Sequence, residues 1–134
     1  MAVFHLQVLT PERTVVSTEV EYVRLPGVDG TFGVLAGHQP LMASLDIGVL
    51  EFGPFHGKRR KIALGGGFVE MRGNQMTVMA RTAELAEEID VLRAREAKRR
   101  AEERLRSRQS DVDVARAQVS LQKALLRLKV ANGE

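Results

Sequence analysis

The sequence predicts a β + α protein, in which an N-terminal antiparallel β-domain precedes a C-terminal antiparallel two-helix hairpin. Residues 1–80 contain short segments of alternating apolar and polar side chains, separated by glycine and proline. This pattern is typical of a β-sandwich or a β-barrel. All six aromatic residues and all four prolines also lie in this part of the chain. The remainder is rich in helix formers, so the two parts should form different kinds of structure.

The predicted strands follow the alternating segments. They are expected at residues 4–8, 14–25, 45–51, 58–64, 68–72 and 76–80. Turns are expected at residues 10–13, 26–30, 53–57 and 73–74, where proline, glycine and asparagine gather. The glycine triplet at 65–67 predicts a bend or a close approach of two backbones. Residues 31–40 form a compact segment in which Gly33 and Gly37 permit positive φ or close packing.

Two helices are expected after the β-domain. The first helix has an apolar stripe at three- and four-residue spacing. Polar residues 107–111 end this helix and offer caps for the second helix. The stripe consists of Ala94, Ala97, Ala101 and Leu105. The facing stripe of the second helix consists of Val114, Ala117, Leu121, Ala124, Leu125 and Leu128. A further row, Ala115, Val119, Leu126 and Val130, predicts a second docking surface or a hairpin that opens, unless the β-domain covers it.

The joint between the two parts lies at residues 81–94. Asp90 is a suitable N-cap for a helix that begins at Val91, because its carboxylate can accept a hydrogen bond from a free backbone N–H. Glu84, Glu87 and Glu88 favour the same helix end. Two interpretations stay open. One is a capped, charge-balanced helix start. The other is a small polar site in which Asp90, Arg93 and free N–H groups bind a phosphorylated or hydrogen-bonding ligand.

Composition excludes several classes of function. The chain has no cysteine, which rules out disulfides and thiolate chemistry, and no apolar run approaches the ~20 residues of a membrane span. The N-terminus lacks the features of a signal peptide. Neither the histidines nor the serines lie in a metal-binding or nucleophile motif, so no catalysis by this chain is predicted.

Positive charge is concentrated in the second part of the chain. Residues 1–80 have no net charge, whereas residues 81–134 carry +3. This asymmetry predicts an acidic partner or, alternatively, only an arginine-rich solvated helix face. It also leaves open a nucleic-acid-binding module with a basic helical arm, although the β-domain lacks basic residues interleaved with aromatics. An enzyme acting through Asp90 and Arg93 is the third alternative, and it lacks a nucleophile or metal cluster.

Three blocks of sequence resemble the epsilon subunit of bacterial F-type ATP synthase, and the resemblance covers essentially the whole chain. The blocks are residues 9–13 (LTPER), residues 31–41 (TFGVLAGHQPL) with Leu45 and Gly48, and residues 66–70 (GGFVE). The chain departs from the family pattern at Ala36, where relatives commonly have proline.

The resemblance implies a β-sandwich domain at residues 1–86 and a helical hairpin at residues 87–134. It implies a non-catalytic central-stalk rotor subunit, peripheral to the cytoplasmic face of the bacterial cell membrane. The sandwich would dock on the gamma subunit and the c-ring, and the residues implied in this contact are Gly33, Gly37, His38 and Pro40. The hairpin would fold down or extend into the alpha/beta catalytic head, near an acidic segment of beta, and there inhibit ATP hydrolysis.

Residues 89–94 (IDVLRA) are similar to the nucleotide motif of epsilon subunits that bind ATP. The similarity implies no required cofactor but a regulatory ligand, ATP or its Mg²⁺ complex, that bridges the two helices. The residues implied in ATP binding are Glu84, Ile89, Asp90, Arg93, Ala94, Arg100, Lys123 and Arg127. Lys123 stands where relatives also use arginine, and a lysine cannot make a bidentate contact.

Overall fold

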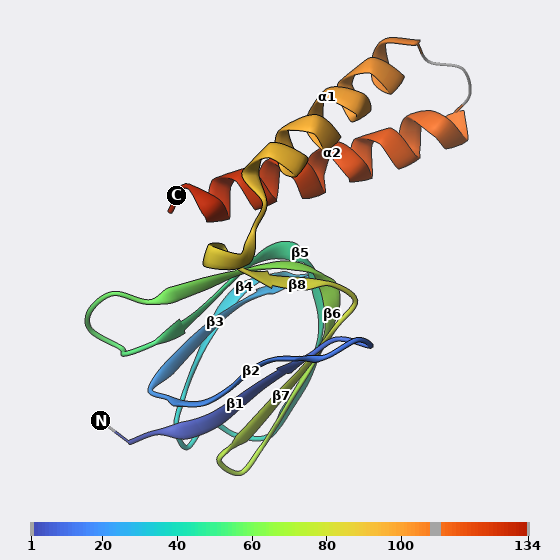
Figure 1. The fold of residues 1–134 in the computed structure, drawn as a ribbon. Coiled ribbons are helices and arrows are strands. Elements are labelled where there is room, and N and C mark those ends of the chain that lie inside the picture. Colours follow the sequence, from blue (N-terminus) through green and yellow to red (C-terminus); the bar gives the residue numbers. More distant parts are fainter. Residues whose placement is uncertain (1, 108–110, 134) are drawn as a thin grey trace. The chain divides into compact units, whose positions relative to one another are not determined.

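The computed structural model describes residues 2–107 and 111–133 of the chain (Figure 1). The chain divides into two compact units, Met1–Leu85 and Ala86–Glu134. The predicted boundary between residues 86 and 87 lies one residue after this division. The first unit is built of strands and the second of helices, which confirms the predicted fold class.

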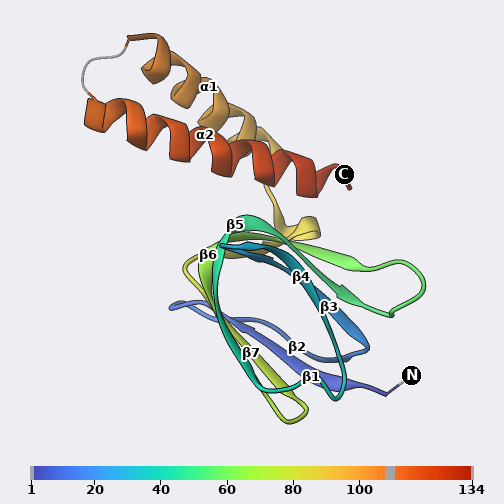
Figure 2. The same cartoon turned by 180° about the vertical axis from the view of Figure 1, so that it is seen from behind.

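Eight strands form the first unit. They are β1 (Phe4–Leu9), β2 (Thr14–Val20), β3 (Tyr22–Gly27), β4 (Gly30–Leu35), β5 (Leu41–Gly53), β6 (Arg60–Arg72), β7 (Gln75–Ala80) and β8 (Ala83–Leu85). Their order is β2-β1-β7-β6-β5-β3-β4, with β8 paired to β6. The sheet folds over on itself, so that β1, β2 and β7 form one layer and β3, β4 and part of β5 face them (Figures 1 and 2).

One strand pair differs from the predicted antiparallel arrangement. β1 pairs in parallel with β7, whereas the other pairs of described strands are antiparallel. Hairpins can join only antiparallel neighbours. The β1–β7 pair joins the first strand of the fold to its seventh within one layer of the sandwich.

The glycine triplet lies inside a single long strand and does not interrupt it. β6 runs through Gly65–Gly67 without a break, which corrects the predicted division into residues 58–64 and 68–72. Before the triplet Ile62 and Leu64 face the core, and after it Val69 and Met71 do so. The strand therefore changes its buried face at the bend. A side chain at Gly67, whose φ is +150°, would collide with the carbonyl oxygen of Met79, so the bend depends on glycine.

The other strands require further corrections. β4 and β8 were not predicted, because residues 26–30 were expected to form a turn, residues 31–40 a compact segment and residues 81–94 a joint. β5 begins at Leu41 and not at the predicted residue 45. The predicted strand at residues 14–25 is two strands, because the chain turns at Glu21 between β2 and β3. β3 also continues through Pro26, at the point where its register with β5 shifts. A proline is tolerated at such a bulge, since the ladder there needs no N–H donor. The two-residue turn at Gly73 and Asn74 is confirmed by the pairing of Arg72 with Gln75.

The sandwich core is made of large side chains. The twelve largest of its fully buried side chains come from strands of both layers. They are Phe4, Leu6, Val8, Val23, Leu25, Val34, Leu50, Phe52, Ile62, Leu64, Met71 and Met76. The sequence predicts that this core holds all six aromatic rings, but only Phe4 and Phe52 are fully buried. The other four rings are half-buried.

The second unit consists of a short 3₁₀ helix, η1 (Ala86–Glu88), and two α-helices, α1 (Val91–Ser107) and α2 (Asp111–Ala131). The helices run antiparallel and pack along a seam (Figure 1). The seam buries Ala94 and Ala101 on α1 and Ala117 and Ala124 on α2. The predicted link at residues 107–111 includes 108–110, which lie outside the described residues.

The stripes of α2 differ from the prediction at two positions. Leu125, predicted to face α1, is 45% exposed, and Val130, assigned to the second row, is fully buried. In that row Ala115 and Val119 are exposed and Leu126 is half-buried. Within this unit η1 contacts α2, so α2 is covered by more than α1. None of the described helices has the length and hydropathy needed to cross a membrane.

Candidate functional site

The start of α1 has the predicted N-cap. A carboxylate oxygen of Asp90 accepts a hydrogen bond from the backbone N–H of Arg93 at 3.1 Å, and the carbonyl of Asp90 accepts one from Ala94 at 3.0 Å. Ile89 precedes the cap and is 8% exposed, and Ala94 is fully buried. The cap thus satisfies the first free donors of the helix and leaves the guanidinium of Arg93 exposed.

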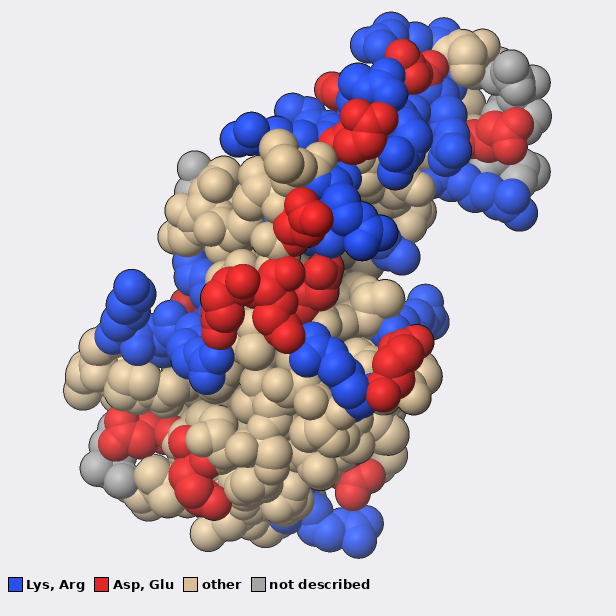
Figure 3. Space-filling view, viewed as in Figure 1, with Lys and Arg blue, Asp and Glu red and all other residues tan. Residues whose placement is uncertain are grey.

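Basic side chains form one row on each helix. On α1 the row is Arg93, Arg100 and Arg104, and on α2 it is Arg116, Lys123 and Arg127. Spacings of four and seven residues place each set along one flank of its helix. Five of the six residues are exposed, and Arg127 is half-buried. Figure 3 shows how densely Lys and Arg side chains cover the helical hairpin.

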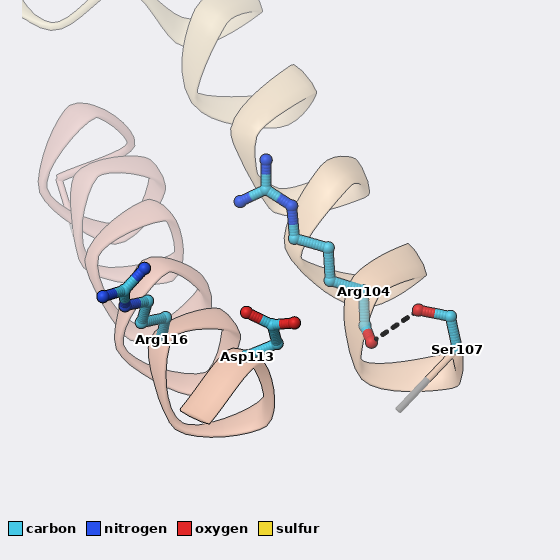
Figure 4. Close-up of a pocket in the computed structure, with 4 residues that line it drawn as sticks. All are labelled: Arg104, Ser107, Asp113 and Arg116. Atoms are coloured by element: carbon cyan, nitrogen blue, oxygen red, sulfur yellow. Dashed lines mark hydrogen bonds between the residues drawn. The ribbon is translucent and has the colours of Figure 1, made fainter. Parts of the chain in front are cut away.

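The two basic rows border the same side of the α1–α2 seam. Arg104 of α1 and Arg116 of α2 line one pocket, together with Ser107 and Asp113 (Figure 4). Since each arginine is a member of its row, both rows must flank the seam on this side. The helix pairing therefore places four of the residues predicted to bind ATP along this one side of the seam, Arg93 and Arg100 on α1 and Lys123 and Arg127 on α2.

Carboxylates of α1 gather on a different face. Arg99 donates to Glu96 at 2.6 and 3.1 Å and to Glu103 at 2.9 Å. The hydrogen bond from Arg99 lowers the pKa of the Glu96 carboxyl, and Glu96 in turn raises the pKa of Arg99. Helical spacing directs these three residues away from the seam. Glu96 also lies 3.7 Å from Arg100, which is the contact of this network with the basic row.

Glu84 is placed differently from the other residues predicted to bind ATP. It lies in β8 of the first unit, opposite Ala63 of β6, whereas the other seven lie in the second unit. Arg104 and Arg116 were not predicted as site residues. Their spacing of four from Arg100 and seven from Lys123 is a signal that could have identified them.

A second candidate site is a hollow of about 440 Å³ in the sandwich. It contains three of the four residues predicted to contact gamma or the c-ring, Gly33, Gly37 and His38. Tyr22, Leu35 and Ala36 complete the described lining. Pro40, the fourth predicted residue, is exposed at the end of the β4–β5 connection. Leu35 is 36% exposed, so the hollow offers an apolar side chain to a partner.

Close packing shapes this hollow. The ring of Tyr22 lies against Gly33, where any Cβ would collide with the ring. The guanidinium of Arg59 stacks over the same ring at 4.5 Å from its centroid, and Phe55 meets it edge-on at 5.5 Å. At the rim, Nδ1 of His38 donates to the carbonyl of Gln39 at 2.7 Å. Gly33 is thus needed for the fit of Tyr22, a contact that spacing alone could not reveal.

Comparison with known proteins shows which protein family the chain matches. A family model described as "ATP synthase, Delta/Epsilon chain, beta-sandwich domain" matches residues 3–86, and the corresponding "long alpha-helix domain" matches residues 87–132. The chain is 48% identical to the ATP synthase epsilon chain of Symbiobacterium thermophilum, over 98% of this chain and 94% of that protein. It is 44% identical to that of Moorella thermoacetica, over 98% of each.

Solved structures share the fold. A chain in the Euglena gracilis mitochondrial ATP synthase, a structure of OSCP, F1 and c-ring, matches with a TM-score of 0.81 and 22% identity over 98% of this chain and 82% of that chain. A chain in the Tetrahymena thermophila mitochondrial ATP synthase central stalk and c-ring matches with a TM-score of 0.60 and 10% identity over 95% of each. At these identities the likeness concerns the fold alone.

Proposed function

The chain belongs to the ATP synthase epsilon-chain family, and from this premise we propose that it is a rotor subunit of the central stalk. It performs no catalysis itself. The sandwich docks on the gamma subunit and the c-ring and so couples the catalytic head to the ring. The hairpin restrains ATP hydrolysis and responds to ATP. The complex holds the chain at the cytoplasmic face of the membrane as a peripheral subunit.

The hollow at Gly33, Gly37 and His38 supports the docking role. An interface needs shape that a partner side chain can fill and apolar surface that it can cover. The hollow supplies the first, and Leu35, 36% exposed, supplies the second. The stacked Tyr22, Phe55 and Arg59 hold one wall of the hollow rigid, which lowers the ordering cost of association.

Charge placed in the hollow tests the docking role. Leu35→Glu should prevent copurification of the chain with gamma and the c-ring, because an unpaired carboxylate would be buried on assembly. Met79→Glu is a matched control, since Met79 is a 47% exposed side chain on β7 that does not line the hollow. Assembly of the Leu35 variant at wild-type yield would refute this docking surface.

The position of both basic rows on one side of the seam is the observation that carries the regulatory proposal. A nucleotide bound there contacts Ile89, Asp90 and Ala94 near the start of α1. Its phosphates contact Arg93 and Arg100 on one helix and Lys123 and Arg127 on the other. Guanidiniums suit phosphate because they donate in a planar fork, and a lysine adds a point charge.

This arrangement links ATP to hairpin conformation by mass action. The nucleotide contacts residues of both helices, so it binds only while the helices are packed together. Binding therefore stabilises the folded hairpin and disfavours an extended form. In the extended form the same basic rows contact the acidic segment of the beta subunit and oppose hydrolysis. A high ATP concentration therefore relieves the inhibition of ATP hydrolysis by the hairpin, and a low ATP concentration favours this inhibition.

Titration calorimetry with ATP, with and without Mg²⁺, tests the sensor. Asp90→Ala and Arg93→Ala should each abolish or strongly weaken saturable binding. Arg95→Ala is a matched control, because Arg95 is exposed on α1 but lies away from the basic row. Equal binding by all four proteins would refute the site.

Truncation after Glu88 tests the restraint separately in the assembled complex. It should preserve assembly through the sandwich and raise the rate of ATP hydrolysis. An unchanged rate would show that the hairpin imposes no restraint, whatever its affinity for ATP.

A further inference from the structure

The pocket between the last turn of α1 and the first turn of α2 is the candidate for a second ligand site. Its volume is about 340 Å³, and Arg104, Ser107, Asp113 and Arg116 line it. We propose that Arg104 and Arg116 bind a phosphate group here, in addition to the nucleotide proposed at the start of α1. This site needs only the packed helices, so it can exist even where the ATP proposal fails.

Distance separates the pocket from the proposed nucleotide motif. Arg104 lies fourteen residues after Asp90 on the same helix, which corresponds to about 21 Å at the α-helical rise. A nucleoside held at Ile89, Asp90 and Ala94 therefore lies near one end of the hairpin and the pocket near the other. The pocket belongs to the same side of the seam, because its two arginines are members of the basic rows, the last of the row on α1 and the first of the row on α2.

The side chains in the pocket suit an anion with several oxygens. Both arginines are exposed, and their guanidiniums extend along the hairpin away from Ser107 (Figure 4). Two planar forks from two helices can bind different oxygens of one tetrahedral phosphate. Ser107 holds the last turn of α1 in place, since its hydroxyl donates to the carbonyl of Arg104 at 3.0 Å.

The charge balance of the pocket differs from that of the neighbouring network. Arg99 lies between two carboxylates, those of Glu96 and Glu103, so its charge is locally compensated. Among the described residues that line the pocket, Asp113 is the only carboxylate, whereas Arg104 and Arg116 supply two guanidiniums. The pocket therefore keeps a net positive charge. The negative charge of Asp113 opposes an incoming anion.

The phosphate could have two sources, which share the same chemistry. One is free inorganic phosphate. The other is the far phosphate of a chain that extends from the nucleotide along the basic rows. These sources differ in one measurable way: only the second makes affinity depend on the length of the phosphate chain.

Titration calorimetry on the full chain with inorganic phosphate, ATP and adenosine 5′-tetraphosphate tests the proposal. Arg104→Ala and Arg116→Ala are the test variants. Arg106→Ala is the control, because Arg106 is exposed in the same turn of α1 as Arg104 but on another face of the helix and does not line the pocket. Alanine favours the helix, and circular dichroism verifies folding. Loss of a charged hydrogen-bonding partner should weaken binding roughly tenfold or more in both test variants.

The probes assign the source. Saturable phosphate binding that is weakened in both test variants and not in the control identifies free phosphate. Tighter binding of the tetraphosphate than of ATP, with the difference lost in the Arg104 variant, identifies a phosphate chain. The proposal is overturned if neither probe distinguishes Arg104→Ala and Arg116→Ala from Arg106→Ala. If, in that case, ATP binding is still lost in Asp90→Ala and Arg93→Ala, the proposed nucleotide site stands although the phosphate site does not.

Asp113→Asn should change phosphate affinity in the opposite direction to the two arginine variants. It removes the carboxylate and keeps the size of the side chain, so phosphate should bind more tightly. Weaker binding would show that the pocket needs its carboxylate for the ligand, which would contradict an anion held by the two arginines.

Discussion

The sandwich and the hairpin bury very different side chains. The sandwich core contains Phe4, Phe52 and a set of leucine, isoleucine, methionine and valine side chains that are nearly inaccessible. The hairpin seam is built on four buried alanines. Burial of a large apolar side chain contributes about 1.5–3 kcal/mol, whereas each methylene-sized group contributes about 0.8 kcal/mol. Each residue of the seam therefore stabilises its unit far less.

This difference separates two tasks within one small chain. A docking unit has to keep its shape under load, and large interlocked side chains provide that. A regulatory unit has to exchange between two arrangements, which requires a small free-energy difference between them. An alanine seam flanked by exposed arginines keeps that difference small and lets an anionic ligand change it.

The largest expected effect is in the sandwich core. Phe52→Ala should lower the free energy of unfolding of the sandwich by roughly 3–5 kcal/mol, because the cavity adds to the lost burial. Urea denaturation followed by the fluorescence of Tyr22, the one tyrosine of the chain, measures it. A loss below 1 kcal/mol would mean that the core is not the rigid structure inferred from its burial.

The bend of β6 should give the next largest effect. Gly67→Ala places a Cβ against the carbonyl oxygen of Met79 and should cost roughly 1–3 kcal/mol, the usual range for overpacking. The same denaturation experiment detects it. Gly73→Ala is a control, since a Cβ at Gly73 meets no heavy atom within 4 Å although its φ is +60°. The comparison separates steric collision from backbone strain.

The helix cap offers a smaller and more local change. Asp90→Ala should reduce helix stability by about 1 kcal/mol, observed as a lower urea midpoint of the circular dichroism signal. Asp90→Asn retains the cap but not the charge. If Asn restores helix stability but not ATP binding, the charge of Asp90 contributes to the ligand. If it restores both, Asp90 acts only through the cap.

The smallest effect concerns the acid dependence of the sandwich. The backbone N–H of Phe55 donates to Glu21 at 3.0 Å and lowers the pKa of that carboxyl. Because the folded pKa is depressed, this stabilisation is present above the unfolded pKa and is lost as pH falls through the folded pKa. Glu21→Gln should therefore lower Tm at neutral pH and match the wild type in strong acid. A Tm difference that does not change with pH would contradict this role.

Local features could be predicted from the sequence. The β1 alternation, the turn at Gly73 and the Asp90 cap depend on residues within one or two turns of chain. Their physical causes are therefore visible in the sequence itself. Burial of Ala94, Ala101, Ala117 and Ala124 also followed from helical spacing.

Features that depend on distant partners could not be predicted. β8 exists because β6 offers it an edge at Ile62–Leu64, and the parallel β1–β7 pair joins segments far apart in the chain. Leu125 is exposed and Val130 is buried, unlike in the predicted stripes, and α2 is contacted by η1 as well as by α1. The rows of arginine were visible within each helix, but their position on one side of the seam depends on how the helices pair.

Urea denaturation of the full chain, followed with two probes, tests most directly the claim that the hairpin is the weaker unit. Tyr22 fluorescence reports the sandwich, and circular dichroism at helical wavelengths reports mainly the hairpin. We predict that the helical signal is lost at lower urea and that ATP moves only this transition upward. Coincident transitions, with or without ATP, would contradict a marginal, ligand-sensitive hairpin on a rigid docking unit.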